Sequence, residues 1–280
     1  MTIPILSVLP MVTEFKNRSR SLRVRVTNRC NAKCSFCHGD GGAIKKLPPF
    51  TYLQHDRLKE LTTILAGKFH SVALTGGEPL LHPEIAQIAH TCIEQLGAPV
   101  HLNTNGLLLK SESISEIVRA GVKDFHINLN TFDSHLYLAN YGVRFPTHLM
   151  ASLEHLRNEG ADVIINCVVL GQHTDIDIHN ILRVCTENGF ALTLIEDHKS
   201  PSPRNGLGFQ DRMFRLLGSV GFQLRSVVPG RCHYSKMNDV VCVAAPCAPA
   251  TAWNGTQEDD AVVLHENGTL TGFLHGEARI

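Results

Sequence analysis

The chain has 280 residues, a formal net charge of zero and 43% hydrophobic residues, which is ordinary for one large globular domain or a domain with an appendage. Its balanced charge gives no sign of a nucleic-acid partner, and no run reaches the ~18–20 apolar residues that a membrane span needs. The sequence has nine cysteines and no recognisable secretory signal, which argues for a reducing compartment. We therefore expect a cytoplasmic protein with neither a nucleic-acid nor a membrane partner.

Strand and helix patterns alternate along residues 21–196. The first expected strand, 21–27, alternates polar and apolar residues, and a loop follows it up to about residue 50. Further strands are expected at 71–75, 99–105, 123–130, 161–170 and 190–196, and helices at 51–66, 83–96, 112–120, in a region up to 158 that Pro146 interrupts, and at 175–188. Helices between strands predict parallel βα units, because parallel neighbours need a crossover connection.

The pattern changes after about residue 200. A linker rich in proline and glycine is expected over 201–208 and a short helix over 210–217. Short strand-like runs follow at 222–228, 239–244, 261–264 and 269–274, and Asn267-Gly268 favours a hairpin between the last two. We predict a lead-in over 1–20, a core domain over 21–200 and a small, mostly β C-terminal cap over 201–280.

Three thiols with C-x3-C-x2-C spacing follow the first expected strand: Cys30, Cys34 and Cys37. Three cysteines this close can ligate one cubane iron–sulfur cluster and leave its fourth iron without a protein ligand. An open iron suits a chelating co-substrate, whereas a ferredoxin would supply a fourth cysteine nearby, and the next one is Cys92. The alternative is a structural zinc site with His38 as the fourth ligand.

The cysteine segment resembles the signature of the radical S-adenosylmethionine (SAM) enzymes. Residues 71–79 resemble the Gly-Gly-Glu turn that binds the SAM amino group in that family, and glycines there let the backbone approach a ligand closely. Residues 101–106, with Thr104-Asn105-Gly106, resemble an element that the molybdenum-cofactor GTP cyclases place beside SAM, and 22–30 resemble the strand that enters their cluster loop. Three such segments in this order favour the radical SAM interpretation over zinc.

The resemblance implies a fold, a cofactor set and a site. The fold is the partial, open (β/α)6 TIM-like barrel of the family, which is α/β. The cofactors are SAM and a 4Fe–4S cluster, whose electron cleaves SAM to a 5′-deoxyadenosyl radical, with flavodoxin or ferredoxin as an external electron donor. The implied metal ligands are Cys30, Cys34 and Cys37, and the implied cofactor-binding residues are Phe36, Gly76, Gly77, Glu78, Pro79, Thr104, Asn105 and Asn128.

One face of several expected strands is polar: Arg23, Arg25, Thr27, Thr75, His101, Asn103, Asn105, His126, Asn128, Asn130 and Asn166. Parallel strands covered by helices have no solvated face, so we expect this face inside the barrel, where closed barrels carry apolar side chains. Arg23 and Arg25 would suit a phosphate or carboxylate, or they balance charge beside the cluster. Candidate contacts to substrate hydroxyls are His126, Asn128, Asn130 and Asn166.

The resemblance to the GTP cyclases weakens toward the C-terminus. Those enzymes bind a second cluster there, but Cys232, Cys242 and Cys247 have a different spacing here. A lysine expected near Ile164 and a later cysteine expected at Gly272 are absent. We expect one cluster and a packed cap with free thiols; the alternative is a second cluster at these three cysteines, in a degenerate auxiliary-cluster region.

These features predict a radical SAM enzyme acting on a small polar metabolite, such as a nucleotide, nucleoside or sugar acid in a biosynthetic pathway. A radical SAM enzyme that modifies a ribosomal peptide is one alternative. A non-catalytic iron–sulfur electron carrier or sensor is another, and the Gly76-Gly77-Glu78 turn argues against it.

Overall fold

The computed structural model describes residues 20–37, 51–197, 208–228, 231–244 and 262–272. The strands in these ranges are β1 Arg20–Arg25, β2 Phe69–Thr75, β3 Val100–Thr104, β4 Asp124–Asn128, β5 Asp162–Val169, β6 Ala191–Glu196, β7 Gln223–Val228, β8 Arg231–Lys236, β9 Asp239–Ala244, β10 Val262–Leu264 and β11 Leu270–Gly272. The helices are α2 His55–Leu65, η2 Pro79–Leu81, α3 Ile85–Leu96, α4 Ser111–Arg119, α5 Ser134–Tyr141, α6 Leu149–Asn158, α7 Asp175–Asn188 and α8 Phe209–Ser219.

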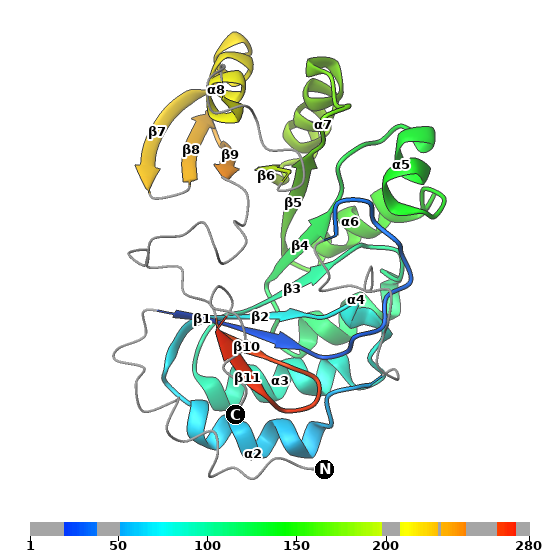
Figure 1. The fold of residues 1–280 in the computed structure, drawn as a ribbon, viewed down its shortest axis with the longest axis vertical. Helices are drawn as coiled ribbons and strands as arrows, with labels where there is room; N and C mark the ends of the chain where they lie inside the picture. Colours follow the sequence, from blue (N-terminus) through cyan, green and yellow to red (C-terminus); the bar gives the residue numbers. More distant parts are fainter. Residues whose placement is uncertain (1–19, 38–50, 198–207, 229–230, 245–261, 273–280) are drawn as a thin grey trace.

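The strands form one curved sheet in the order β11-β10-β1-β2-β3-β4-β5-β6-β9-β8-β7. Strands β1 to β6 are all parallel to their neighbours, and helices follow the outer side of the curve (Figure 1). This confirms the predicted α/β fold with a parallel core. No helix within the described ranges combines the length and apolar character needed to cross a membrane.

Successive side chains of a strand point to opposite faces of the sheet, so every second residue packs against the helices. Leu22 and Val24 of β1 are fully buried, and Val72 and Leu74 of β2 lie beside them in register. Burying a side chain of this size contributes about 1.5–3 kcal/mol. The intervening residues of β1, β3, β4 and β5 are only partly buried, so they face the concave side, where a cavity lies.

The C-terminal strands extend both edges of the parallel core. Strand β9 runs parallel to β6 and pairs with β8, while β10 runs parallel to β1 and forms a hairpin with β11. In Figure 1 the β10–β11 hairpin lies against β1, although most of the sequence separates them. The mostly β character and the hairpin are confirmed, whereas strand β8 is absent from the sequence prediction.

Two expected helices differ from the observed ones. Helix α2 begins at His55 rather than near residue 51 because the preceding residues stay extended: Leu53 N–H donates to the Val26 carbonyl (2.8 Å), and Thr27 pairs with Tyr52. The region interrupted by Pro146 forms two helices, α5 and α6, and Gly142 ends the first in the left-handed conformation (φ 68°). Such a C-terminus suits glycine because it has no Cβ.

Candidate active site

A cavity of about 260 Å³ lies at the carboxyl ends of the parallel strands. Cys30, Cys34 and Cys37 line it, together with Arg23, Ala32, Phe36, Thr75, Gly76, Gly77, Glu78, Asn103, Thr104, Asn105, Asn128, Asn166, Val168, Ile195 and Glu196. The three thiols are all partly exposed. The sheet therefore brings the cysteine loop, the Gly-Gly-Glu turn and the polar strand face to one space.

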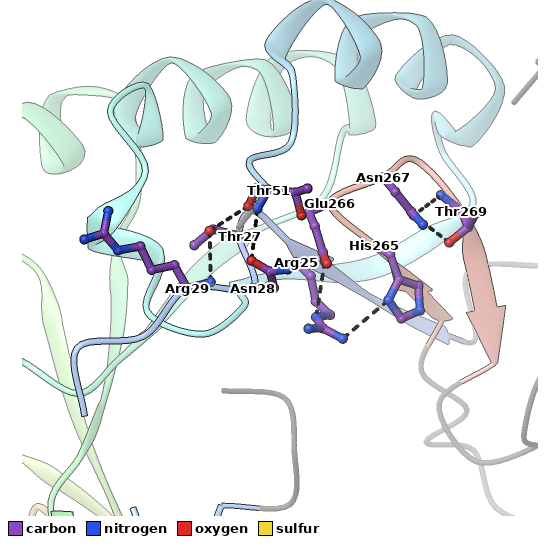
Figure 2. Close-up of polar contacts among 9 residues, drawn as sticks. All are labelled: Arg25, Thr27, Asn28, Arg29, Thr51, His265, Glu266, Asn267 and Thr269. Atoms are coloured by element: carbon purple, nitrogen blue, oxygen red, sulfur yellow. Dashed lines mark hydrogen bonds and ion pairs between the residues drawn. The ribbon is translucent and has the colours of Figure 1, made fainter. Parts of the chain in front are cut away.

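The cysteine loop is fixed on both sides by backbone contacts. On one side, the N–H groups of Lys33 and Ser35 donate to the carbonyls of Tyr141 (2.9 Å) and Asn140 (2.8 Å), at the C-terminal end of α5. On the other, the Thr27 hydroxyl donates to the Thr51 carbonyl (2.8 Å) and Thr51 N–H donates to the Asn28 side chain (3.1 Å) (Figure 2). The loop thus holds its thiols in place through contacts that do not involve the sulfur atoms.

The two glycines let the second strand pack directly on the cysteine loop. Gly77 N–H donates to the Thr27 carbonyl (2.7 Å) and Glu78 N–H to the Arg29 carbonyl (2.8 Å). A Cβ on Gly77 would lie 2.1 Å from the Arg29 carbonyl oxygen, and Gly76 has a φ of +145°. The close approach that these glycines permit is therefore to the chain itself, where the sequence suggested only a ligand.

The Glu78 carboxylate is almost fully buried and joins three elements. It accepts hydrogen bonds from the Thr104 hydroxyl (2.7 Å), Asn105 N–H (2.8 Å) and Leu80 N–H (3.0 Å). Burial raises its pKa to about 7, against the opposing effect of these bonds. The Asn105 amide in turn donates to the Asn31 side chain (2.8 Å) and reaches the Cys30 sulfur (3.9 Å).

The electrostatics of the thiols fit a metal cluster. Burial, followed by the charges of Cys30 and Cys37, raises the pKa of Cys34 to about 12. Burial is also the main cause that raises the pKa of Cys30. Three thiolates this close repel one another until bound cations compensate them, as the irons of a cluster would.

The spacing of the described histidine, cysteine and acidic side chains favours a cluster over the single zinc ion of the alternative. Among the described residues, no three histidine, cysteine or acidic side chains gather tightly enough to hold a single metal ion. In a cubane cluster each thiolate binds a different iron, so its ligands can stay further apart. His38, the fourth ligand of the zinc alternative, lies outside the described residues.

A buried hydroxyl without a partner also lies beside the thiols. The Tyr137 ring stacks on Tyr141 with 4.2 Å between ring centroids, and Tyr141 in turn contacts Phe36 edge-on at 5.2 Å. The Tyr137 hydroxyl has no hydrogen-bond partner within the described part of the chain, and burial, then the Cys34 charge, raises its pKa. Buried unsatisfied groups are rare and often mark a ligand that is not shown, and cluster sulfur would supply an acceptor.

Apart from the candidate second-cluster cysteines, most predicted site residues line the cavity, and four do not. Pro79 is buried and begins η2, and the His126 ring packs against that of His101, with 4.6 Å between ring centroids. Asn130 is fully buried; its N–H donates to the Tyr141 hydroxyl (3.0 Å) and its side chain accepts from Asn140. Asn130 thus joins β4 to α5, away from the predicted substrate contact.

Arg25, the fourth predicted residue that does not line the cavity, contacts the β10–β11 hairpin instead. Its Nε lies 3.6 Å from Glu266 Oε2 and its Nη1 3.4 Å from His265 Nδ1 (Figure 2). Both side chains of the ion pair are largely buried, 14% and 11% exposed. The sequence prediction that Arg25 and Arg23 face the substrate together is therefore not supported, because β10 pairs with β1 and the turn after β10 supplies the Glu266 carboxylate.

The candidate second-cluster cysteines do not converge in the described strands. Cys232 pairs with Val243, and Cys242 with His233. Directly paired residues share a face and successive residues alternate, so Cys232 and Cys242 point to opposite faces of the sheet. Cys247 lies outside the described residues.

Sequence reasoning missed several residues of the site. Asn140 and Tyr141 act partly through backbone carbonyls, which leave no side-chain signature. Glu196 and Ile195 end the last core strand, and Ile195 has no polar atom to attract notice.

A parallel α/β sheet with three loop thiols at one cavity defines a class of proteins. Residues 24–185 match the model of the Radical SAM superfamily, and the chain belongs to this family. The predicted family and its enzyme character are thereby confirmed, and the family implies SAM and an iron–sulfur cluster.

Several curated relatives are GTP 3',8-cyclases. The chain is 29% identical over 193 residues to the enzyme of Rhizobium leguminosarum bv. trifolii, covering 67% of this chain and 54% of the relative. It is 30% identical over 191 residues to GTP 3',8-cyclase 2 of Mycobacterium tuberculosis, covering 67% and 52%. The chain spans about half the length of these relatives.

Solved structures share the fold at low sequence identity. Streptococcus suis SuiB bound to S-adenosylmethionine aligns with a TM-score of 0.63 at 17% identity, covering 89% of this chain and 59% of that one. Coproporphyrinogen III oxidase from Escherichia coli aligns with a TM-score of 0.60 at 15% identity, covering 94% and 67%. These similarities support the fold alone.

Proposed function

We propose that this protein is a radical SAM enzyme acting on a small, polar, anionic metabolite such as a nucleotide, nucleoside or sugar acid. The observation that carries the proposal is a cavity inside a radical SAM fold that is lined by three loop thiols and by polar side chains of the strands. Cys30, Cys34 and Cys37 would hold one 4Fe–4S cluster. When bound, that cluster supplies the electron that cleaves SAM to methionine and a 5′-deoxyadenosyl radical, and an external flavodoxin or ferredoxin renews the electron.

The chain's own residues would position SAM around the thiols. The Gly76-Gly77-Glu78 turn and Asn105 border the cavity beside Cys30. Glu78 fixes Thr104 and the Asn105 backbone, so the Asn105 amide is oriented before a ligand arrives. Fixed donors and acceptors of this kind reduce the cost of binding. Phe36 and Asn128 complete the candidate SAM contacts.

The rest of the cavity favours a polar substrate. Thr75, Asn103 and Asn166 face it from three strands, with Arg23 as a cation and Glu196 as an acid. Amide and hydroxyl side chains can donate to and accept from sugar hydroxyls, and a guanidinium suits a phosphate or carboxylate. We infer a catalytic core over 21–200, to which residues 201–280 add strands on both edges.

Substrate-dependent SAM cleavage tests this function. Anaerobically reconstituted protein with SAM and dithionite is given nucleotides, nucleosides, uronic-acid conjugates and peptides in turn, and 5′-deoxyadenosine is measured. We expect one anionic small molecule to raise its formation above background, and Cys34→Ala to abolish it. Cys92→Ala, which removes a buried thiol distant in sequence, is the matched control. Stimulation by peptides alone would contradict the small-molecule proposal and favour the peptide-modifying alternative.

A further inference from the structure

The sulfur of Cys30 in the candidate cluster site is approached by two N–H donors. The backbone N–H of Ala32, in the same loop, donates to it at 3.5 Å. The side-chain amide nitrogen Nδ2 of Asn105, which follows strand β3, lies 3.9 Å from it. Sulfur is a large and weak acceptor, so distances of this size still allow a hydrogen bond. The second donor lies 75 residues further along the chain, so the fold, not the loop, brings it to the sulfur.

The contacts of the Asn105 side chain determine which end of the amide faces the sulfur. Leu107 N–H donates to the Asn105 oxygen Oδ1 (3.0 Å). A backbone N–H can only donate, so the atom beside Leu107 must be the oxygen and the NH2 group must lie on the other side. That NH2 group donates one hydrogen to Asn31 Oδ1 (2.8 Å) and has a second one for Cys30. The chain itself therefore orients the donor.

The backbone of Asn105 is held as firmly as its side chain. Its N–H donates to Glu78 Oε2 (2.8 Å), and Glu78 Oε1 accepts from the Thr104 hydroxyl (2.7 Å). The Thr104 oxygen accepts in turn from Gly106 N–H (3.1 Å). Asn105 is only 6% exposed and Glu78 1%. Asn105 cannot turn away from Cys30 without leaving buried polar groups unsatisfied, which costs about 1–3 kcal/mol for each group.

A fixed N–H group beside a ligand sulfur has a defined electrostatic effect. Cysteine binds iron as a thiolate, and a hydrogen bond to an ionised acceptor is stronger than one to a neutral acceptor. Reduction adds one electron to the cluster and its thiolates, so the donors stabilise the reduced state more than the oxidised state. Hydrogen bonds to the sulfurs are among the factors that set the potential of such clusters. Donors at Cys30 would therefore make the cluster easier to reduce.

We propose that the Asn105 amide hydrogen-bonds the Cys30 thiolate and raises the reduction potential of the cluster. The inference rests on the proposed function, because it concerns the cluster that this function requires. The family resemblance implies only a SAM contact for Asn105, whereas its contacts direct both amide hydrogens to the cysteine loop. Glu78 is then a positioning residue, because it holds the Asn105 backbone.

A redox titration followed by electron paramagnetic resonance tests the inference without substrate or turnover. The midpoint potential of the reconstituted cluster is measured without SAM in the wild type, Asn105→Leu and Asn105→Asp. Leucine has nearly the shape of asparagine but no donor, so we expect a more negative potential and a severalfold smaller equilibrium constant for reduction. Aspartate keeps the acceptor for Leu107 N–H but replaces the donor by a negative charge. We expect its potential to be the lowest of the three.

The matched control is Asn103→Leu, which removes an amide from strand β3 that also lines the cavity. Within the part of the chain that the structure describes, Asn103 has no hydrogen bond to a thiol. This variant should keep the wild-type potential. Iron content and melting temperature, measured for each variant, separate a change in potential from a loss of the cluster or of the fold.

A second measurement is made on the wild type, so it does not depend on any variant keeping its cluster. The side-chain amides of asparagine are labelled with nitrogen-15, and the reduced cluster is studied by pulsed electron paramagnetic resonance. We expect an amide nitrogen that is magnetically coupled to the cluster in the wild type. The same coupling should persist in Asn103→Leu and be lost in Asn105→Leu.

The outcomes separate this inference from the proposed function. If Asn105→Leu and Asn103→Leu have the same potential, or if the wild type shows no coupled amide nitrogen, the inference is wrong even where SAM is cleaved. If Asn105→Leu alone lowers the potential but SAM is never cleaved, the inference stands and the proposed function fails. A protein that takes up no iron–sulfur cluster overturns both.

Discussion

The absence of a side chain at Gly77 lets the Gly-Gly-Glu turn pack directly against the cysteine loop. A Cβ there would lie 2.1 Å from the Arg29 carbonyl oxygen and 2.9 Å from the Cys30 nitrogen. Both neighbours are backbone atoms of the cysteine loop, so they cannot move aside without displacing the thiols.

We therefore predict that Gly77→Ala reduces iron incorporation severalfold. The control is Gly218→Ala in α8, where a Cβ would meet nothing within 4 Å and should stabilise the helix by about 0.5–1 kcal/mol. Iron content after identical reconstitution is the measurement. Equal loading of the two variants would show that the contact between turn and loop is dispensable.

Two stacked tyrosines allow a paired comparison at atomic scale. The Tyr141 hydroxyl accepts a hydrogen bond from buried Asn130 N–H (3.0 Å), whereas the Tyr137 hydroxyl has no partner in the described residues. Tyr141→Phe should cost about 1–3 kcal/mol because a buried donor is left unsatisfied. Tyr137→Phe should leave the stability of the cluster-free protein unchanged or raise it, as measured by urea unfolding. The reverse order of the two effects would contradict the assigned contacts.

At the scale of elements, buried polar side chains fix the short connections around the site. His82 follows η2; its Nε2 contacts the Leu53 carbonyl (2.9 Å) and its Nδ1 accepts from Glu84 N–H (3.1 Å). Only a neutral imidazole can donate at one nitrogen and accept at the other. Burial accordingly lowers the pKa of His82 from its ordinary value of 6.5.

The lowered pKa of His82 predicts that the stability of the fold decreases as the pH falls. The native state binds fewer protons than the unfolded state once pH falls below 6.5, the ordinary pKa of histidine, so stability present at higher pH is lost there. We predict that the free energy of unfolding decreases from about pH 7.5 to 5.5 less in His82→Gln than in the wild type. His135→Gln, at an exposed position of α5, should keep the wild-type slope. A His82→Gln slope equal to that of the wild type would refute the neutral imidazole.

The sequence predicts elements well where a hydrophobic period repeats and poorly where pairing partners are distant. The βα rhythm places the six core strands β1 to β6, because each helix must bury one apolar face against the sheet. The sequence did not predict strand β8 because its residues Arg231–Lys236 carry little apolar character. The strand is defined by its pairing with β9.

At the scale of the whole molecule, the C-terminal strands belong to the same sheet as the core. Because β10 joins β1 and β9 joins β6, both ends of the parallel sheet acquire residues from the second half of the chain (Figure 1). This is why the sequence located the thiols and the Gly-Gly-Glu turn but misassigned Arg25. Local motifs specify the loop, whereas the partners of Arg25 depend on which strands meet.

The central claim is that three thiols hold a cluster whose open iron accepts SAM. Electron paramagnetic resonance of the anaerobic, dithionite-reduced protein tests it most directly, with iron and sulfide measured on the same sample. The account predicts about four irons per chain, a signal from the reduced cluster that SAM changes, and loss of that signal in Cys34→Ala. A spectrum unaffected by SAM, or zinc in place of iron, would contradict it.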